Sequence, residues 1–206
     1  TQSYAPLPFV DGVSQLVPKN PGAPVHAGDT LLLYDGLHGN VDQFGMYNTA
    51  YITIMAAPGA VPILERFRLQ GCARWRLEGV YARGEPYGNF HSEHLVYFGT
   101  HGWHGPMREV EVRECVVYSA LNTAAWTAQD WVDRHSDGIH VIGKQAVVLN
   151  NELTNVHFGI IAAGDSIQAI GNSIINFSGD GMRPLGNDIL FEGNTIKNCY
   201  AVDGNH

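Results

Sequence analysis

The sequence has little charge and few of the residues that mark common functional sites. Only 16% of its 206 residues are charged, and its three cysteines are odd in number and widely spaced. This spacing favours neither a disulfide framework nor a zinc ribbon. Phosphate-binding loops, nucleophile elbows and dinucleotide fingerprints are also absent from the sequence. The familiar nucleotide-binding and serine-hydrolase motifs therefore do not explain this chain.

Positive charge and long apolar runs are scarce as well. Twelve basic residues against twenty acidic ones give a net charge of −8, which argues against nucleic acid and anionic membranes as default partners. The apolar runs are too short for membrane insertion, and no signal peptide opens the sequence. Thr1 stands first, which is compatible with a leader removed on export. Hydrophobic residues still make up 45% of the chain, with 24 glycines, so we expect a turn-rich domain with a core.

The C-terminal third of the sequence contains an internal repeat of 21 or 22 residues. A glycine is followed thirteen residues later by an asparagine and four residues after that by another, three times in succession. The triplets are Gly138, Gly159 and Gly181; Asn151, Asn172 and Asn194; and Asn155, Asn176 and Asn198. Aliphatic residues recur at matching positions between these markers. A fixed period of this length is typical of solenoids.

The repeat units are short β-branched runs separated by Gly, Asn and Asp, which predicts strands rather than helices. We therefore expect an all-β, right-handed parallel β-helix of about seven coils, with aliphatic and asparagine side chains stacked in columns. Residues 1–28 are expected to form a lead-in and cap, and residues 29–206 the β-helix domain. Carrying the repeat backwards places earlier markers at Gly36, Ala57, Glu78 and Cys115.

Two intervals of this repeat are longer than the others by about fifteen residues, which predicts insertions at about 84–107 and 118–135. Insertions in a solenoid lie on its surface, where binding groups concentrate. The insertions are rich in aromatic residues and histidine, so they either wall a binding groove or pack on each other as a lid. The candidate substrate-binding residues are Tyr87, His91, Tyr97, Trp103, Trp126, Trp131 and Arg134.

The turn before each marker glycine predicts an acidic edge with histidine and arginine beside it. Its candidate catalytic residues are Asp137, His140, Asp180, Arg183, Asp203 and His206. Stacked carboxylates about 5–10 Å apart suit a glycoside hydrolase. A lyase would instead use His140 or Lys144 as the base, with Arg183 on the sugar carboxylate. The competing interpretation is that Asp-Gly is ordinary turn chemistry without catalytic meaning.

The sequence gives weaker indications of metal binding. His91 and His94, like His101 and His104, have the spacing of metal ligands, but a third ligand is not defined, so no dedicated metal site is expected. Stacked Asp and Asn oxygens leave calcium open. No other cofactor is expected.

The chain resembles the right-handed parallel β-helix repeat proteins of the pectate-lyase-like superfamily over about residues 28–206. The opening AGDTLLLYDG at 27–36, followed by YITI at 51–54, is similar to chondroitinase-B-like and alginate lyases. The DGIH run at 137–140 is similar to a motif of polygalacturonase-type coils. The lysine- and arginine-bearing catalytic strands of the lyases, and the paired aspartates of polygalacturonases, are not recognisable.

This resemblance implies a protein that handles polysaccharides, because the fold hosts lyases, hydrolases, epimerases and binding spikes. We expect an enzyme that degrades or modifies an acidic polysaccharide; the alternative is a non-catalytic glycan-binding module of a phage-type spike or cell-surface protein. Either implies an extracellular, periplasmic or virion-surface location. The last repeat begins at Gly204 and is unfinished, so we expect another chain, or a further portion of this one, to cover the open end.

Overall fold

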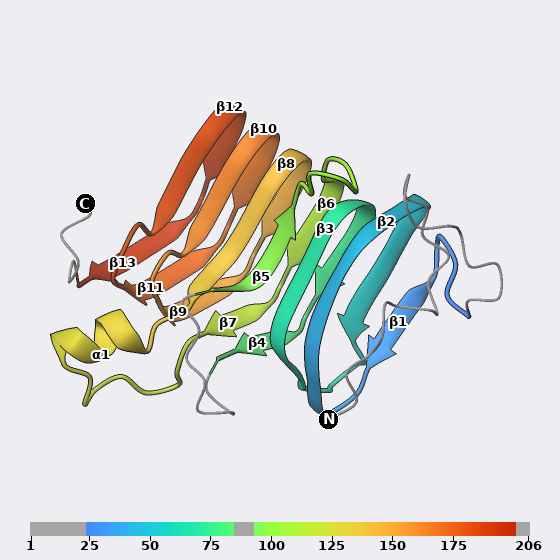
Figure 1. Ribbon diagram of the computed structural model, residues 1–206. Coiled ribbons are helices and arrows are strands. Elements are labelled where there is room, and N and C mark those ends of the chain that lie inside the picture. Colours follow the sequence, from blue (N-terminus) through green and yellow to red (C-terminus); the bar gives the residue numbers. More distant parts are fainter. Residues whose placement is uncertain (1–23, 85–92, 201–206) are drawn as a thin grey trace.

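The computed structural model describes residues 24–84 and 93–200. Within these ranges the structure is all-β, with strands paired in parallel and one short helix (Figure 1). The predicted fold class is therefore confirmed at this level. The strands are β1 (Thr30–Leu33), β2 (Gly36–Ala56), β3 (Pro62–Glu78), β4 (Tyr81–Arg83), β5 (His94–Gly99), β6 (Arg108–Arg113), β7 (Val116–Tyr118), β8 (Asp137–Leu149), β9 (Glu152–Val156), β10 (Ile160–Ile170), β11 (Ser173–Phe177), β12 (Met182–Glu192) and β13 (Thr195–Cys199), and the helix is α1 (Ala128–Asp133).

The long strands bend, so each takes part in more than one ladder of parallel pairs. Ladder 1 contains the starts of β2 and β3 and then β4, β7, β9, β11 and β13. Ladder 2 contains the middle of β2 and β3, then β5 and the first halves of β8, β10 and β12. Ladder 3 contains β1, β6 and the last parts of the long strands. Successive stretches of the chain thus lie on one another in the same order.

Glycine marks the bend between ladders 2 and 3. Gly143, Gly164 and Gly186 pair in register at this point. A Cβ atom added to Gly164 would lie 1.9 Å from the carbonyl oxygen of Gly143. Backbone therefore stacks directly on backbone here, and no side chain fits between the layers.

The asparagine markers form the expected column. The backbone N–H of Asn151 donates to Oδ1 of Asn172, and that of Asn172 donates to Oδ1 of Asn194, each at 2.9 Å. The N–H of Cys115 donates to Oδ1 of Asn151 in the same way. A second, outer column links Asn155, Asn176 and Asn198 through their side-chain amides, and all three have positive φ. The repeat period and both asparagine columns are confirmed.

The register predicted for the first coils is wrong by two residues. The sequence pattern pairs Ile52 with Ala73, whereas the structure pairs Ile52 with Trp75 and Leu31 with Ile54. Both observed pairs are 23 residues apart, whereas the markers carried back from Asn151 assumed an interval of 21. A slip of two keeps every side chain on the same face of a strand. The aliphatic pattern therefore could not distinguish the two registers.

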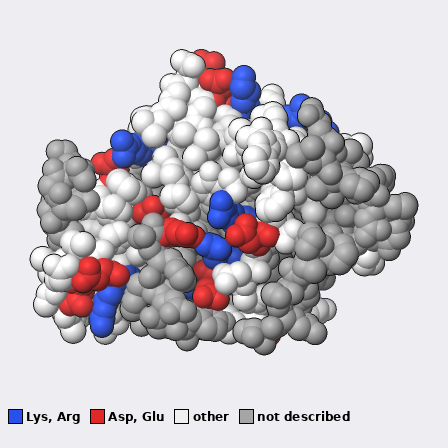
Figure 2. Space-filling view, viewed as in Figure 1, with Lys and Arg blue, Asp and Glu red and all other residues white. Residues whose placement is uncertain are grey.

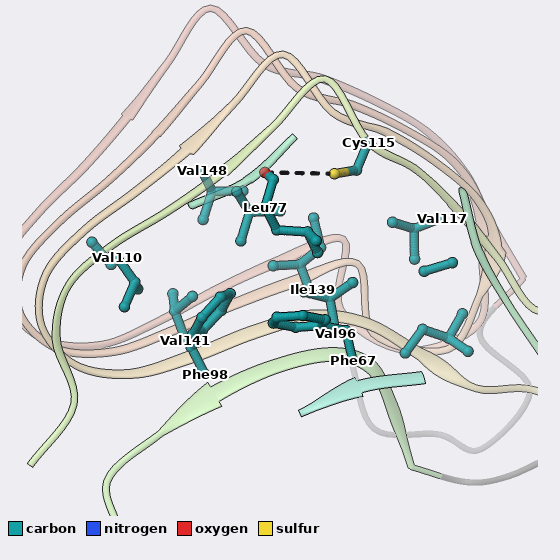
Figure 3. Close-up of a cluster of buried hydrophobic side chains, with 14 of the residues drawn as sticks. Phe67, Leu77, Val96, Phe98, Val110, Cys115, Val117, Ile139, Val141 and Val148 are labelled. Carbon is teal, nitrogen blue, oxygen red and sulfur yellow. Dashed lines mark hydrogen bonds between the residues drawn. The ribbon is translucent and has the colours of Figure 1, made fainter. Parts of the chain in front are cut away.

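The core is a continuous column of aliphatic and aromatic side chains between the ladders. Phe67 and Phe98 are fully buried, with ring centroids 5.4 Å apart, and pack beside Ile139 and Val141 (Figure 3). The Cys115 thiol is buried in the same column and contacts the Leu77 carbonyl, and burial raises its pKa to about 12. This thiol is therefore a structural group rather than a nucleophile.

The two predicted insertions differ from expectation. The region 84–107 is not one excursion, because β5 pairs with β3 and β8 inside ladder 2. The described turn at 101–105 leaves the ladders, and residues 85–92 lie outside the described ranges. The region 118–135 does leave the ladders, and it contains α1, which the strand pattern did not predict. Thr127 and Asp130 form a reciprocal capping box that starts this helix.

The last strands, β12 and β13, are largely exposed on the side away from β10 and β11 (Figure 1). Leu185, Leu190 and Ile196 are each more than 40% exposed. Cys199 is exposed for the same reason. Most of the predicted cap at residues 1–28, and the unfinished repeat at 201–206, lie outside the described residues. Within the described residues, no helix is long and apolar enough to cross a membrane.

Candidate active site

A row of five side chains, four of them polar or cationic and one the buried Ile161, runs along the outer face of ladder 2. Parallel pairing places Arg68 beside Tyr97, Tyr97 beside His140, His140 beside Ile161, and Ile161 beside Arg183. Their neighbours in sequence, such as Phe67, Val96 and Ile139, point into the core. The alternation of strand side chains therefore directs this whole row outward. We call these five residues the ladder 2 row.

Three histidines gather around Asp137 at the start of β8. Oδ2 of Asp137 lies 3.0 Å from Nδ1 of His94, and Oδ1 lies 3.2 Å from Nδ1 of His157. Nδ1 of His140 lies 2.9–3.0 Å from the ring nitrogens of His94. The side chain of Asp137 is only 11% exposed. We call Asp137, His94, His140 and His157 the histidine cluster.

The surroundings lower the pKa of two members of this cluster, Asp137 and His140. Burial by itself would raise the pKa of Asp137, but the bonds from His157 and His94 outweigh it and hold that pKa far below its ordinary value. Burial lowers the pKa of His140 to about 3, and the neighbouring His94 and Arg183 act in the same direction. Asp137 is therefore ionised and His140 neutral at neutral pH.

Tyr97 lies between the cluster and the rest of the row. Its ring stacks on His94 at 5.1 Å and meets His140 edge-on at 5.9 Å. Burial raises its pKa, so the phenol keeps its proton at neutral pH. The ring lies flat over Gly99, where an added Cβ would come within 2.4 Å of it. Glycine at 99 is thus what allows the phenol to lie along the strand.

Cations stand on both sides of Tyr97 and His140. The guanidinium of Arg68 lies 5.7 Å from the Tyr97 ring centroid, and Nη1 lies 3.7 Å from Oδ2 of Asp42. Arg183 lies two strands from His140, or roughly 10 Å at normal strand spacing. Nε of Arg183 is 3.6 Å from Oδ2 of Asp180. Acidic and basic side chains are interleaved on the face shown in Figure 2.

A second feature is a cavity of about 610 Å³ beneath the 119–135 segment, on the outer side of ladder 1. The Trp131 ring stacks on Tyr200 at 4.7 Å and meets Trp126 edge-on at 4.9 Å. The cavity is lined by Leu121, Asn122, Thr123, Ala124, Trp126, Ala128, Trp131, Thr154, Asn155, Asn176 and Tyr200. Helix α1 lies beside the ends of β9, β11 and β13 (Figure 1).

A third feature is an aromatic group at the far end of ladder 2. Trp103 is 79% exposed and lies in the 101–105 turn, where His101 and Gly105 bond each other. The rings of His101 and His104 pack on Phe44 of β2 at 5.4 and 4.6 Å. Phe44 is itself 46% exposed. This aromatic group offers a flat surface to solvent.

The structure brings together several of the residues singled out from the sequence. His140 and Arg183 lie in the ladder 2 row with Tyr97, while Asp137 and Asp180 stand just before it. Trp126 and Trp131 line the cavity. Arg134, also a candidate substrate-binding residue, pairs with Asp130 at 3.3 Å. Asp203, His206, Tyr87 and His91 lie outside the described residues.

Other expectations need correction. Lys144, considered as a base, lies beyond the Gly143 bend and pairs with Asp165 at 3.0 Å. His94 was expected in an insertion, yet it belongs to β5 and contacts Asp137. Sequence reasoning also missed Arg68 and Tyr200. Arg68 occupies an outward-facing position of a strand, which was the available signal. Its neighbour Tyr97 lies in the segment 84–107, which the repeat pattern treated as an insertion, so the pairing of the two residues could not be predicted.

Replacing His140 should change how stability depends on pH. An unfolded histidine takes a proton near pH 6.5, whereas folded His140 resists it down to about pH 3. The free energy of unfolding therefore falls as pH decreases through this interval, by at most about 1.4 kcal/mol per pH unit from this group. His140→Gln should flatten that part of the curve.

Urea unfolding at pH 7, 6 and 5 tests this, because Asp137 loses its contribution only below about pH 4. His94 and His157 face the cluster in both proteins, and the difference between wild type and variant reports the loss of the His140 imidazole. His38→Gln, at an exposed histidine bonded to the Tyr34 carbonyl, should leave the slope unchanged. Equal slopes in wild type and His140→Gln would contradict the expectation.

Within the described residues, no group of three or more His, Cys, Asp or Glu side chains is arranged to hold a metal ion. Comparisons of the chain with protein-family models, with curated proteins and with solved structures found no match. What the site can do must therefore be argued from its own residues and geometry.

Proposed function

We propose that the chain is a right-handed parallel β-helix that cleaves an acidic polysaccharide by β-elimination. The observation that carries the proposal is the ladder 2 row, in which a neutral histidine lies beside a protonated tyrosine on one side and, beyond Ile161, an arginine on the other. Parallel ladders with a 21- or 22-residue repeat support the β-helix. A solenoid of this kind presents a long flat face on which a polymer can lie.

The reaction needs a base, a cation and a proton donor. Nε2 of His140 takes the proton from the sugar carbon next to the carboxylate, and that electron pair forms the C4–C5 double bond. The C4–O bond breaks, and the departing oxygen takes the Tyr97 hydroxyl proton. Arg183 neutralises the carboxylate, on which negative charge develops. His140 then releases its proton to solvent, and the Tyr97 phenolate takes one up.

The position of His140 fits the role of base, and its lowered pKa makes the ring an available but weaker base than an ordinary histidine. Its Nδ1 is held against His94, and no described residue bonds its Nε2. Its lowered pKa keeps it unprotonated at neutral pH. Asp137 acts as a positioning residue, because it holds His94, which in turn holds His140. This chain of contacts fixes the ring that must meet the substrate.

Hydrolysis is less well supported. A glycosidase needs one carboxylic acid that carries a proton. Asp137 is held ionised by two histidines, and Asp180 is paired with Arg183. Neither is an obvious proton donor, whereas Tyr97 is.

The direct test is to incubate the protein with polygalacturonate, alginate, chondroitin sulfate and hyaluronan and to follow the ultraviolet absorbance of the conjugated C4–C5 double bond that β-elimination creates. A rise with at least one polymer is expected. Reducing ends that appear without absorbance would show hydrolysis instead. Neither signal with any acidic polymer would reject the enzymatic proposal.

The exposed aromatic group favours a second candidate, a non-catalytic glycan-binding module. Trp103 and Phe44 present aromatic faces of the kind that carry binding energy. On this alternative, no polymer is cleaved, but glycan binding weakens about tenfold in Trp103→Ala by isothermal titration. Val61→Ala, at an exposed apolar residue outside both this group and the cavity, serves as the control for general surface effects. Unchanged binding in Trp103→Ala would remove this candidate's support.

We further propose that another chain, or a further portion of the polypeptide, covers β12 and β13, whose apolar residues are exposed. Light scattering tests whether the protein associates, and a monomer at high concentration would argue against a second copy. An extracellular, periplasmic or virion-surface location remains part of the same proposal, and so does a polysaccharide as partner.

A further inference from the structure

We infer that the cavity beneath α1 is a binding site for an uncharged sugar unit, separate from the ladder 2 row. Its volume of about 610 Å³ lies in the range of small-molecule sites. The inference does not depend on elimination chemistry, because it rests only on the lining of the cavity.

The lining has aromatic surface and no charge. None of its eleven residues is Asp, Glu, Lys, Arg or His. Trp126 and Tyr200 provide aromatic surface on either side of Trp131, which is only 4% exposed and supports both rings, while Tyr200 remains 47% exposed. Sugar rings carry apolar C–H faces, which pack on aromatic faces, whereas a carboxylate here would lose hydration without gaining a cation. The lining therefore favours a neutral ring.

Some polar groups at the cavity are already hydrogen-bonded within the protein, and others are open to a ligand. Asn155 is occupied, because its Oδ1 accepts from Thr123 and Asn176 and its Nδ2 donates to the Ala120 carbonyl. The Nδ2 group of Asn122 and the hydroxyl of Thr154 have no hydrogen-bond partner among the described residues. A few directed polar groups around an aromatic surface are what a sugar hydroxyl pattern requires.

The cavity is also held in a defined shape. The capping box of Thr127 and Asp130 starts α1, and the Trp131 carbonyl contacts Nδ1 of His135. The His135 ring packs on His157 at 4.1 Å. Residues 119–135 are thereby anchored to the bend that carries the histidine cluster, so binding needs little reorganisation.

The test is isothermal titration of the protein with cellotetraose, xylotetraose and mannotetraose, with tetragalacturonate as the charged comparison. Binding of at least one neutral tetrasaccharide is expected. Trp126→Ala should weaken it about tenfold, as expected for loss of an aromatic contact. Thr154→Val keeps the shape of the side chain and should weaken it several-fold through the lost hydroxyl.

Val132→Ala is the matched control, since Val132 lies on α1, is exposed and does not line the cavity. It should bind as wild type does, and circular dichroism checks that each variant is folded. His140→Gln should also retain neutral binding, which separates this inference from the proposed elimination. Absence of binding by all three neutral tetrasaccharides, or equal weakening in Val132→Ala, would overturn it.

Discussion

Asn172→Ala is expected to lower the free energy of unfolding by about 3–5 kcal/mol, because it leaves several buried polar groups unpaired. The Asn172 side chain accepts from the backbone and side-chain N–H groups of Asn151. It donates to the Val148 carbonyl and to Oδ1 of Asn194. The residue is only 1% exposed, so water cannot readily replace these bonds. Urea unfolding followed by circular dichroism measures the change.

Asn187→Ala is the matched control for this column. Asn187 lies in the adjacent strand of ladder 3, and its exposed amide donates to Oδ1 of Asp165 at 3.1 Å. Removing it should change stability by no more than about 0.5 kcal/mol. Similar losses in the two variants would show that the buried asparagine column does not stabilise the stacking of the coils.

His140→Gln should reduce kcat for β-elimination by about 10²–10⁴-fold, the usual contribution of a positioned general base. Glutamine keeps a polar side chain of similar reach but cannot take the proton. KM should change much less, since Arg183 and Arg68 remain to hold the substrate carboxylates. Initial rates of absorbance increase on the polymer identified by the screen measure both constants.

The pH profile gives an independent check on this role. With the pKa of His140 lowered to about 3, the base stays unprotonated in mildly acidic solution. The fall of kcat/KM on the acidic side should therefore lie well below pH 6.5. His38→Gln should leave rate and profile unchanged. A full rate in His140→Gln would exclude this histidine as the base, even if the protein proved to be a lyase.

Several features followed from the sequence because they depend on local spacing. Asn151, Asn172 and Asn194 recur at intervals of 21 and 22 residues, and hydrogen bonds of their side-chain amides join adjacent layers. The outward positions of His140 and Arg183 follow from strand alternation once that interval is known. Asp137 and Asp180 likewise fall at equivalent turns. The all-β class, the column of markers and part of the candidate site could therefore be predicted without coordinates.

Only the tertiary structure showed which residues meet across the insertions. His94 reaches Asp137 because β5 inserts between β3 and β8, and no repeat in the sequence marks that strand. The first register was ambiguous because a slip of two preserves the side-chain face. The cavity required α1 to fold back over Thr154 and Tyr200, which are distant in sequence. Periodicity specifies vertical neighbours, whereas segments outside the repeat find their contacts through packing, which spacing does not encode.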